Sequence, residues 1–214
     1  MRTHFKTWVK PFIDAHQDII IDEDYISTSE KLKNFLLLDN LYLEIGPGKG
    51  SFMISLAEKF PQYNFLCIEK CQTIAGIFAK KVFNSKLTNV FIISSDVFDI
   101  FPLIKKSSIC GIFLNHPDPW PKLRHTKRRL TSKLFLDVYK NILKDDSQLI
   151  FKTDNDDLFA FSKEELINND WLISDCEDDY KGNDSFDAFT DYQLNFISQG
   201  VKIKRLKAKY NGTK

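Results

Sequence analysis

Short apolar runs alternate with helical patterns along most of this chain, and this alternation restricts the fold more than any other feature. Five continuous apolar or β-branched runs predict strands buried on both faces: residues 41–45, 65–68, 89–93, 109–114 and 149–151. Between the first two runs, Met53, Leu56 and Ala57 recur at helical spacing. Two further strands are expected near 171–174 and 201–204. The pattern predicts a doubly wound α/β fold, with a mostly parallel seven-stranded sheet and helices on both faces.

The first 30 residues precede this alternation, which predicts an N-terminal extension (1–30) followed by a single domain (31–214) without a Gly/Ser/Pro-rich linker. No run approaches the roughly 20 apolar residues that span a bilayer. Cys67 and Cys71 have no second Cys/His pair at zinc-ligand spacing, and four cysteines are too few for a disulfide scaffold. We therefore expect a cytoplasmic protein without metal or membrane, and leave monomer or homodimer open.

The nearly neutral net charge hides segregated blocks of charge. Lys and Arg number 30 and Asp and Glu 29, which gives a formal net charge of +1. Acidic residues dominate 14–30 and 175–187, and we expect these to be solvated faces. Basic residues dominate 122–133 and the tail after Gly200. Local fields select partners, so the basic blocks predict contact with a polyanion.

A glycine-rich turn, EIGPGKG at 44–50, follows the first predicted strand. Ligands of open α/β sheets bind at the carboxyl ends of the strands, and glycines allow close backbone approach there. The order of residues is wrong for a phosphate-binding P-loop. Gly50 also comes too early to be the third glycine of a dinucleotide-binding fingerprint, which disfavours a nicotinamide oxidoreductase.

Three acids mark the ends of the first three strands of the domain. Glu69 can accept hydrogen bonds from two ribose hydroxyls, and Asp96 can accept one from an adenine amino group, with Val97 or Phe98 against the ring. Glu44 can hold a cationic amino-acid group through water or the loop backbone. At this point the sequence resembles S-adenosylmethionine-dependent methyltransferases with a Rossmann-like sheet.

The fourth strand runs into the segment NHPDPWPK at 115–122. Its three prolines stiffen the backbone and hold Asp118 and Trp120 in a fixed loop. A carboxylate beside an indole ring can orient a planar base, by hydrogen bonding and by stacking. The basic run that follows can neutralise the phosphates of a nucleic acid.

Together, PDPWPK and the following RHTKRRL resemble the tRNA (guanine-N7-)-methyltransferase family of the bacterial TrmB type. The FKTDN segment at 151–155, Thr190 with Tyr192, and a basic-aromatic stretch from Arg2 to Trp8 are also similar. The resemblance implies methyl transfer from S-adenosyl-L-methionine to N7 of a guanine in the variable loop of tRNA, which forms 7-methylguanosine.

The resemblance also implies roles for individual residues. The expected cofactor-binding set is Glu44, Gly46, Gly48, Gly50, Glu69, Asp96, Val97 and Asp118. The expected substrate and RNA contacts are Lys122, Arg124, His125, Lys127, Arg128, Arg129, Asp154, Thr190 and Gln193. Asp118 is the expected catalytic residue; guanine N7 has a free lone pair, so the carboxylate orients the base and stabilises the developing cation. Two positions depart from the family: Gln193 replaces a Glu, and His116 replaces an aromatic or small residue.

Two alternative functions remain open at the level of sequence. Asn115-His116-Pro117 with Trp120 partly matches the Asn-Pro-Pro-aromatic loop of exocyclic-amine methyltransferases, although the inserted Asp118 fits that loop poorly. The other alternative is a non-catalytic RNA-binding protein with a methyltransferase fold. A failure to bind S-adenosylmethionine would distinguish it from an enzyme.

Overall fold

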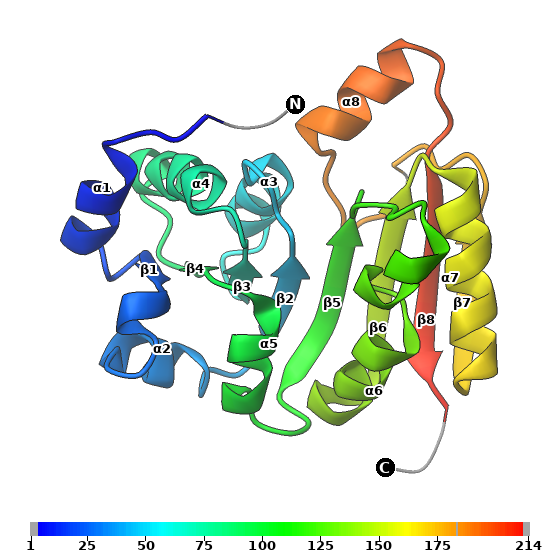
Figure 1. The fold of residues 1–214 in the computed structure, drawn as a ribbon, viewed down its shortest axis with the longest axis horizontal. Coiled ribbons are helices and arrows are strands. Elements are labelled where there is room, and N and C mark those ends of the chain that lie inside the picture. Colours follow the sequence, from blue (N-terminus) through cyan, green and yellow to red (C-terminus); the bar gives the residue numbers. More distant parts are fainter. Residues whose placement is uncertain (1–3, 183, 212–214) are drawn as a thin grey trace.

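An eight-stranded sheet with helices on both faces forms the framework of the protein (Figure 1). The computed structural model describes residues 4–182 and 184–211. The strands are β1 (Ile20–Asp22), β2 (Leu41–Ile45), β3 (Asn64–Ile68), β4 (Val90–Ser94), β5 (Ile109–Asn115), β6 (Leu143–Thr153), β7 (Trp171–Glu177) and β8 (Lys204–Tyr210). The α-helices are α1 (Val9–Ala15), α2 (Glu30–Phe35), α3 (Ser51–Lys59), α4 (Gln72–Ser85), α5 (Val97–Ile100), α6 (Lys133–Ile142), α7 (Asp156–Asn168) and α8 (Asp191–Ser198). Short 3₁₀ turns are η1 (Glu23–Tyr25), η2 (Phe101–Leu103) and η3 (Leu123–Arg128).

The strand order is β1-β4-β3-β2-β5-β6-β8-β7, and β8 runs antiparallel to both of its neighbours while the other pairs are parallel. The predicted α/β class is confirmed, but the prediction of seven strands is wrong. The eighth strand is β1, inside the segment predicted to be an extension, where buried Ile20 and Ile21 pair with Ile92 and Ile93 of β4. A run of three residues is too short for its periodicity to be recognised.

The last strand was also misplaced, since β8 begins at Lys204 where the predicted strand ends. Arg205, Leu206 and Ala208 of β8 are buried, with Arg205 on one face of the sheet and Leu206 and Ala208 on the other. The expectation that the basic tail is a free RNA-binding surface is wrong for Arg205. Its guanidinium donates hydrogen bonds to Glu177 at 2.6 Å, to Asp184 at 2.7 Å and also to Asp175. The acidic segment 175–187 thus supplies counter-charges to β8.

The acidic segment at 14–30 also supplies counter-charges to a lysine of the fold. Lys10 of α1 pairs with Asp14 at 3.1 Å and with Asp22 and Asp24 at 2.8 Å each. These carboxylates raise the pKa of Lys10 despite the opposing effect of burial. Asp14 and Asp24 remain exposed, as predicted for a solvated face, but Asp22 is 2% exposed and its pairing with Lys10 fastens α1 to β1. Arg2, in the predicted basic-aromatic stretch, lies outside the described residues.

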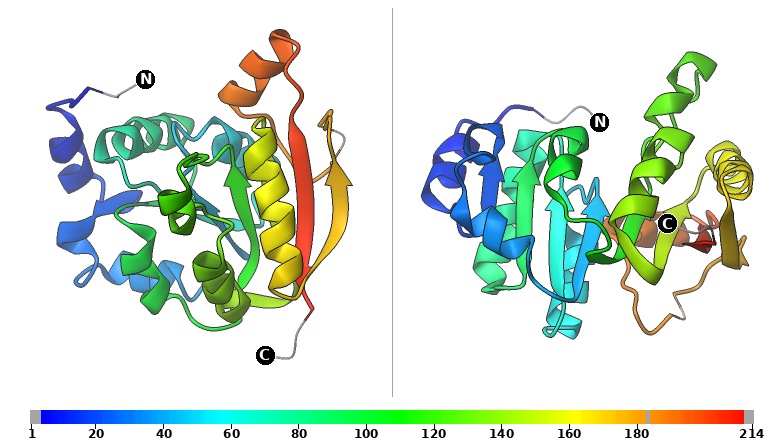
Figure 2. Two further views of the ribbon diagram at one scale, coloured as in Figure 1. Left: turned by 45° about the vertical axis from the view of Figure 1, so that its right-hand side comes forward. Right: turned by 90° about the horizontal axis from the view of Figure 1, so that it is seen from below.

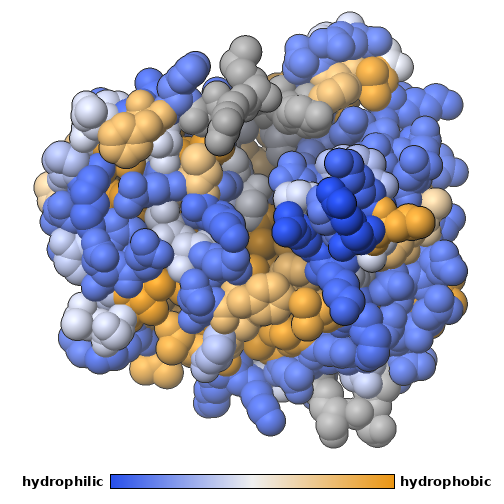
Figure 3. All heavy atoms as spheres, in the orientation of Figure 1, coloured by the Kyte–Doolittle hydropathy of each residue, from blue (hydrophilic) through white to orange (hydrophobic). Residues whose placement is uncertain are grey.

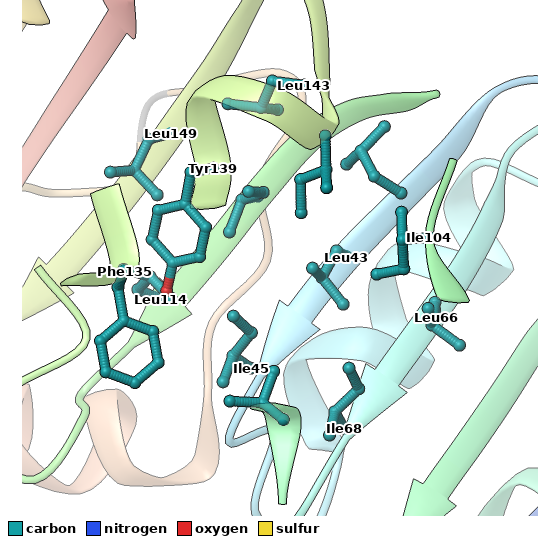
Figure 4. Packing of buried hydrophobic residues seen from close by; sticks show 14 of the residues in the cluster. Leu43, Ile45, Leu66, Ile68, Ile104, Leu114, Phe135, Tyr139, Leu143 and Leu149 are labelled. Carbon is teal, nitrogen blue, oxygen red and sulfur yellow. The ribbon is translucent and has the colours of Figure 1, made fainter. Parts of the chain in front are cut away.

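Helices cover both faces of the sheet (Figure 2), and an apolar layer is buried beneath the helices on each face. Helices α1, α3 and α4 cover one face, with Val9, Phe52 and Phe78 fully buried in that layer. Helices α2, α5, α6 and α7 cover the other, where Phe135 and Tyr139 of α6 face the strand residues of the layer (Figure 4). Because both faces are covered, the strands are apolar on both sides and only their ends can carry polar groups.

The chain reverses its direction of winding between β2 and β5. From β2 it proceeds outward through β3 to β4, and from β5 it proceeds in the opposite direction to β6. In open α/β sheets a crevice opens at this switch point, outside the carboxyl ends of the strands. The predicted site residues follow β2, β3, β4 and β5, so the topology gathers them along one edge.

Candidate active site

A cavity of about 960 Å³ lies at the carboxyl ends of β2, β3, β4 and β5. Its wall includes Gly46 after β2, Glu69 after β3, Asp96 and Val97 after β4, and Asp118 after β5. Five residues that were separate in the sequence prediction are therefore brought to one cavity. Its volume is within the range of small-molecule and cofactor sites.

The glycine turn shapes one end of this cavity. Gly46 has φ +74°, a conformation that disfavours other residues, and no heavy atom lies within 4 Å of the place where a Cβ would stand. The N–H of Gly48 donates to Glu69 Oε2 at 3.2 Å. Gly50 does not line the cavity: a Cβ there would lie 1.9 Å from Phe78 of α4. Gly50 thus allows α3 and α4 to pack, and its predicted contact with the cofactor stays a prediction.

Glu44 lies beneath the cavity rather than in its wall. It is 1% exposed, and its Oε1 accepts a hydrogen bond from Asn115 Nδ2 at 2.7 Å. The other oxygen, Oε2, has no hydrogen-bond partner among the described residues. Burial raises the pKa of Glu44 to about 7, against the opposing effects of Asn115 and the nearby Lys152. Since Glu44 does not line the cavity, its expected contact with a cationic ligand group through water or the loop backbone stays a prediction.

Glu69 and Asp96 hold fixed carboxylates at the ends of β3 and β4. Glu69 Oε1 accepts a hydrogen bond from the N–H of Cys71 at 2.9 Å, which orients it across the start of α4, while burial raises its pKa. Asp96 caps α5, with Oδ1 accepting from the N–H of Phe98 at 3.0 Å. Its Oδ2 accepts from Lys70 Nζ at 2.7 Å, and that contact lowers the pKa of Asp96. Both carboxylates keep lone pairs available for a ligand.

The far wall of the cavity is apolar. Val97 and Phe98 of α5 face it together with Leu134 and Phe135 of α6. Figure 3 shows hydrophobic surface across the middle of this face, beside strongly hydrophilic side chains. Phe98 and Leu134 are 39% and 49% exposed, which is high for large apolar side chains. Such a wall suits the flat face of an aromatic ligand group.

The proline-rich loop after β5 is held in an unusual backbone conformation. His116 and Trp120 have φ of +47° and +41°, which is uncommon for residues other than glycine. Arg129 fixes the loop, because its guanidinium donates to the carbonyls of Pro119 at 3.0 Å and Trp120 at 3.1 Å. Asp118 is thereby presented as an exposed carboxylate in the cavity wall.

Arg129 consequently does not serve the RNA-contacting role predicted for it. It is buried, and its guanidinium packs 4.3 Å from the centre of the Phe161 ring. The rest of the basic run differs in this respect. Lys122 and Arg124 are exposed, and Lys127 and Arg128 line the mouth of the cavity. Arg128 lies 4.9 Å from the Trp120 ring centre, as expected for a cation–π contact, and His125 packs edge-on against the same ring at 5.5 Å.

The three remaining predicted substrate residues come from two segments beyond β6. Asp154 reaches the cavity through His116, whose Nδ1 lies 3.3 Å from Asp154 Oδ1. Thr190 caps α8 by accepting a hydrogen bond from the N–H of Gln193 at 2.7 Å. The Gln193 side chain is fully buried, and neither amide atom has a hydrogen-bond partner among the described residues. Helix α8 lies beyond the carboxyl ends of β5 and β6 (Figure 1).

Comparison with known proteins decides the family. A family of putative methyltransferases matches residues 39–206. A tRNA (guanine-N(7)-)-methyltransferase of Staphylococcus haemolyticus is 35% identical over 212 residues, covering 99% of both chains. One of Mesoplasma florum is 38% identical over 219 residues, covering 96% of this chain and 97% of the relative. This chain belongs to the tRNA (guanine-N7-)-methyltransferases.

Solved structures agree with this at the level of the fold. A 16S ribosomal RNA methyltransferase aligns with a TM-score of 0.64 at 13% identity, covering 86% of this chain and 94% of that one. An antibiotic-related methyltransferase aligns with a TM-score of 0.62 at 19% identity, covering 84% and 92%. At identities this low, the similarity shows the Rossmann-like fold alone.

As a tRNA (guanine-N7-)-methyltransferase, the protein transfers a methyl group from S-adenosylmethionine to N7 of a guanine in tRNA. The predicted family, activity and cofactor are confirmed, which decides against the exocyclic-amine, oxidoreductase and non-catalytic alternatives. No helix in residues 4–182 and 184–211 is both long and apolar enough to cross a membrane. Within the same residues, no group of three or more His, Cys, Asp or Glu side chains is arranged to hold a metal ion.

The methyltransferase site also includes residues that sequence reasoning missed. Asn115 orients Glu44, and Lys70 pairs with Asp96, but neither belongs to a recognisable spacing. Lys152 is 0% exposed beneath the site and donates to Asp187 Oδ1 at 2.7 Å. The available signal for Lys152 was its position in the FKTDN segment, between apolar Phe151 and Thr153 at the end of β6.

Proposed function

We propose that S-adenosylmethionine binds in the cavity with its ribose at Glu69 and its adenine between Asp96 and the apolar wall of α5 and α6. The cavity volume, the two oriented carboxylates and the partly exposed Phe98 support this placement. Gly46, with no atom where a Cβ would stand, leaves room for the amino-acid portion. The unpartnered Oε2 of Glu44 beneath the cavity provides a negative end for its ammonium group.

The target guanosine then lies between the proline-rich loop and α8. Asp118 in the cavity wall and Asp154 beside His116 supply carboxylates on one side. Thr190 and the unpartnered amide of Gln193 supply hydrogen-bonding groups on the other. A Gln amide can donate and accept, so it can pair with the guanine edge without adding a charge. The target base is proposed to lie in the variable loop of tRNA.

The exposed basic run carries the affinity for the tRNA backbone. Lys122, Arg124, Lys127 and Arg128 stand around η3 at the mouth of the cavity, and His125 packs on Trp120. Phosphate contacts of this kind position a nucleic acid without reading its sequence. The choice of base is therefore assigned to the residues around the cavity, while the basic rim positions the tRNA backbone.

Asp118 is the proposed catalytic residue, and it acts as a fixed charge. Bound S-adenosylmethionine supplies an electrophilic methyl group. Guanine N7 attacks with its in-plane lone pair, so no residue needs to remove a proton beforehand. The purine gains positive charge during transfer, and a preoriented carboxylate nearby stabilises that charge. Arg129 keeps the loop rigid, which holds the base and the carboxylate in a productive geometry.

The observation that carries this assignment is the placement of Asp118 in the wall of the cavity that also contains Glu69 and Asp96. The test is Asp118→Asn, which keeps the shape and removes the charge. We expect kcat to fall by about 10²–10³-fold, as for loss of one preoriented electrostatic group. Calorimetric binding of S-adenosylmethionine should remain within a few fold, and nucleoside analysis should detect only 7-methylguanosine.

Asp137→Asn is the matched control, because Asp137 lies on the exposed side of α6 and pairs with Lys133. It should leave both kcat and cofactor binding at wild-type values. Near-wild-type turnover by Asp118→Asn would refute the catalytic assignment while leaving the family activity intact.

A further inference from the structure

Lys152 is a completely buried cation beneath the active site. Its Nζ donates to Asp187 Oδ1 at 2.7 Å and to the carbonyl of Ala188 at 3.3 Å. The same ammonium lies 4.6 Å from the centre of the Phe52 ring. Burial lowers the pKa of Lys152, while Asp187 and Glu44 both act to raise it.

The main chain of Lys152 contacts the catalytic loop. Its carbonyl accepts a hydrogen bond from the N–H of His116 at 2.8 Å, where the chain leaves β5 for Asp118. The backbone and the side chain of one residue therefore hold two segments: the proline-rich loop and the stretch that leads to α8. Because Lys152 is on β6, a strand inside the sheet, both segments are attached to the same rigid element.

Asp187 has a second partner from the same segment. Its Oδ2 accepts a hydrogen bond from the hydroxyl of Tyr180 at 2.5 Å, and Tyr180 is 1% exposed. The peptide N–H of Asp184 in turn donates to the Tyr180 hydroxyl at 3.3 Å. The residues that lead to α8 are thus held to the sheet at two points: Asp184 pairs with Arg205 and Lys207 of β8, and Asp187 pairs with Lys152 of β6. Asp187 is the nearer of the two to Thr190, the N-cap of α8.

A buried ion pair is a weak way to increase stability, because desolvation of both charges offsets most of their attraction. Its directional contacts are better suited to fixing one geometry among several. We propose that the Lys152–Asp187 ion pair positions residues 180–182 and 184–190, and through them Thr190 and Gln193, for binding of the target nucleotide. Lys152 and Asp187 are positioning residues in this account, and the account rests on the proposed placement of guanosine at α8.

Asp187→Asn tests this directly, because it preserves size and removes the charge partner. The KM for tRNA should rise about tenfold, the effect of losing about 1.4 kcal/mol in binding. The Kd of S-adenosylmethionine, measured by calorimetry, should stay within about twofold, since the cofactor contacts come from other strands. Tyr180→Phe is the milder variant and should shift KM in the same direction by a smaller factor.

Limited trypsin digestion measures the position of the segment independently of activity. Lys181 lies within it and is 73% exposed, so its cleavage reports local opening. Asp187→Asn should increase cleavage after Lys181 about tenfold, with cleavage after Lys33 in α2 unchanged as the internal standard. The matched control Asp137→Asn removes a 2.8 Å contact to Lys133 on an exposed face and should change neither KM nor cleavage.

Unchanged KM and unchanged cleavage at Lys181 in Asp187→Asn would overturn the proposal. A rise in the cofactor Kd equal to the rise in KM would also overturn it, because it would indicate general loosening of the site. Thr190→Ala separates this from the proposed function: an unaffected KM in that variant would refute guanosine binding at Thr190, whatever Asp187→Asn does. If both assignments hold, the double variant should lose less than the product of the two single effects.

Discussion

Glu44 is a buried carboxylate whose ionisation should be visible in the stability of the cofactor-free protein. It is 1% exposed, and burial raises its pKa from an ordinary value of 4.5 to about 7. The unfolded chain therefore releases this proton at lower pH than the folded protein does. The stabilising contribution of the neutral carboxyl is fully present below pH 4.5 and is lost as the pH rises through about 7.

The magnitude follows from the two pKa values. At 1.36 kcal/mol per pKa unit, the interval between 4.5 and about 7 corresponds to about 3 kcal/mol. Glu44→Gln has no ionisable group at this position. Its free energy of unfolding relative to wild type should therefore increase by about 3 kcal/mol between pH 4 and pH 8.

Urea unfolding of both proteins, followed by circular dichroism at each pH, measures this difference and cancels the titration of all other groups. Glu58→Gln, the same substitution at an exposed position of α3, is the control. A difference between Glu44→Gln and wild type that is constant from pH 4 to pH 8 would refute the reasoning about Glu44.

Three further predictions concern packing, loop geometry and RNA binding. Gly50→Ala should reduce the free energy of unfolding by about 3 kcal/mol in urea titrations, because its φ is +74° and the new Cβ would meet Phe78; a loss below about 1 kcal/mol would contradict this. Arg129→Lys cannot reproduce the two hydrogen bonds to the proline-rich loop, so kcat should fall about tenfold in methyl-transfer assays while the salt dependence of KM is unchanged. Arg128→Ala should instead reduce the slope of log KM for tRNA against log salt by about one, and an unchanged slope would remove Arg128 from the RNA contacts.

Much of the fold was predictable because it depends on local patterns. Continuous apolar runs located β2 to β5 and the second half of β6, helical spacing located α3, and the prolines with Asp118 located the loop after β5. Two strands were not recognised at their true positions. Strand β1 is short and lies among acids, and β8 is a basic strand whose polar side chains hide its alternation. Both become strands through pairing with a neighbour that is distant in the sequence.

The candidate site was predictable as a set of residue types but not as a set of contacts. The string from Pro117 to Leu130 indicated a base-binding loop with a basic rim, and the cavity gathers Asp118 with Glu69 and Asp96. Within that string Arg129 holds the loop instead of facing solvent. Its guanidinium donates to the carbonyls of Pro119 and Trp120, which come close to it only when the loop is folded. Periodicity and composition carry no information about such contacts.

The sequence by itself determined the class of the sheet, the end of the sheet at which the site lies, and the chemistry of that site. These follow from short-range patterns: apolar period, glycine and proline positions, and acids at strand ends. Only the tertiary structure decided which charges are used internally. Acids of the two segments that were expected to be solvated form ion pairs within the fold: Asp22 with Lys10, Asp187 with Lys152 and Asp184 with Arg205. The physical reason is that an ion pair depends on distance and burial, and both are set by strands paired across the sheet.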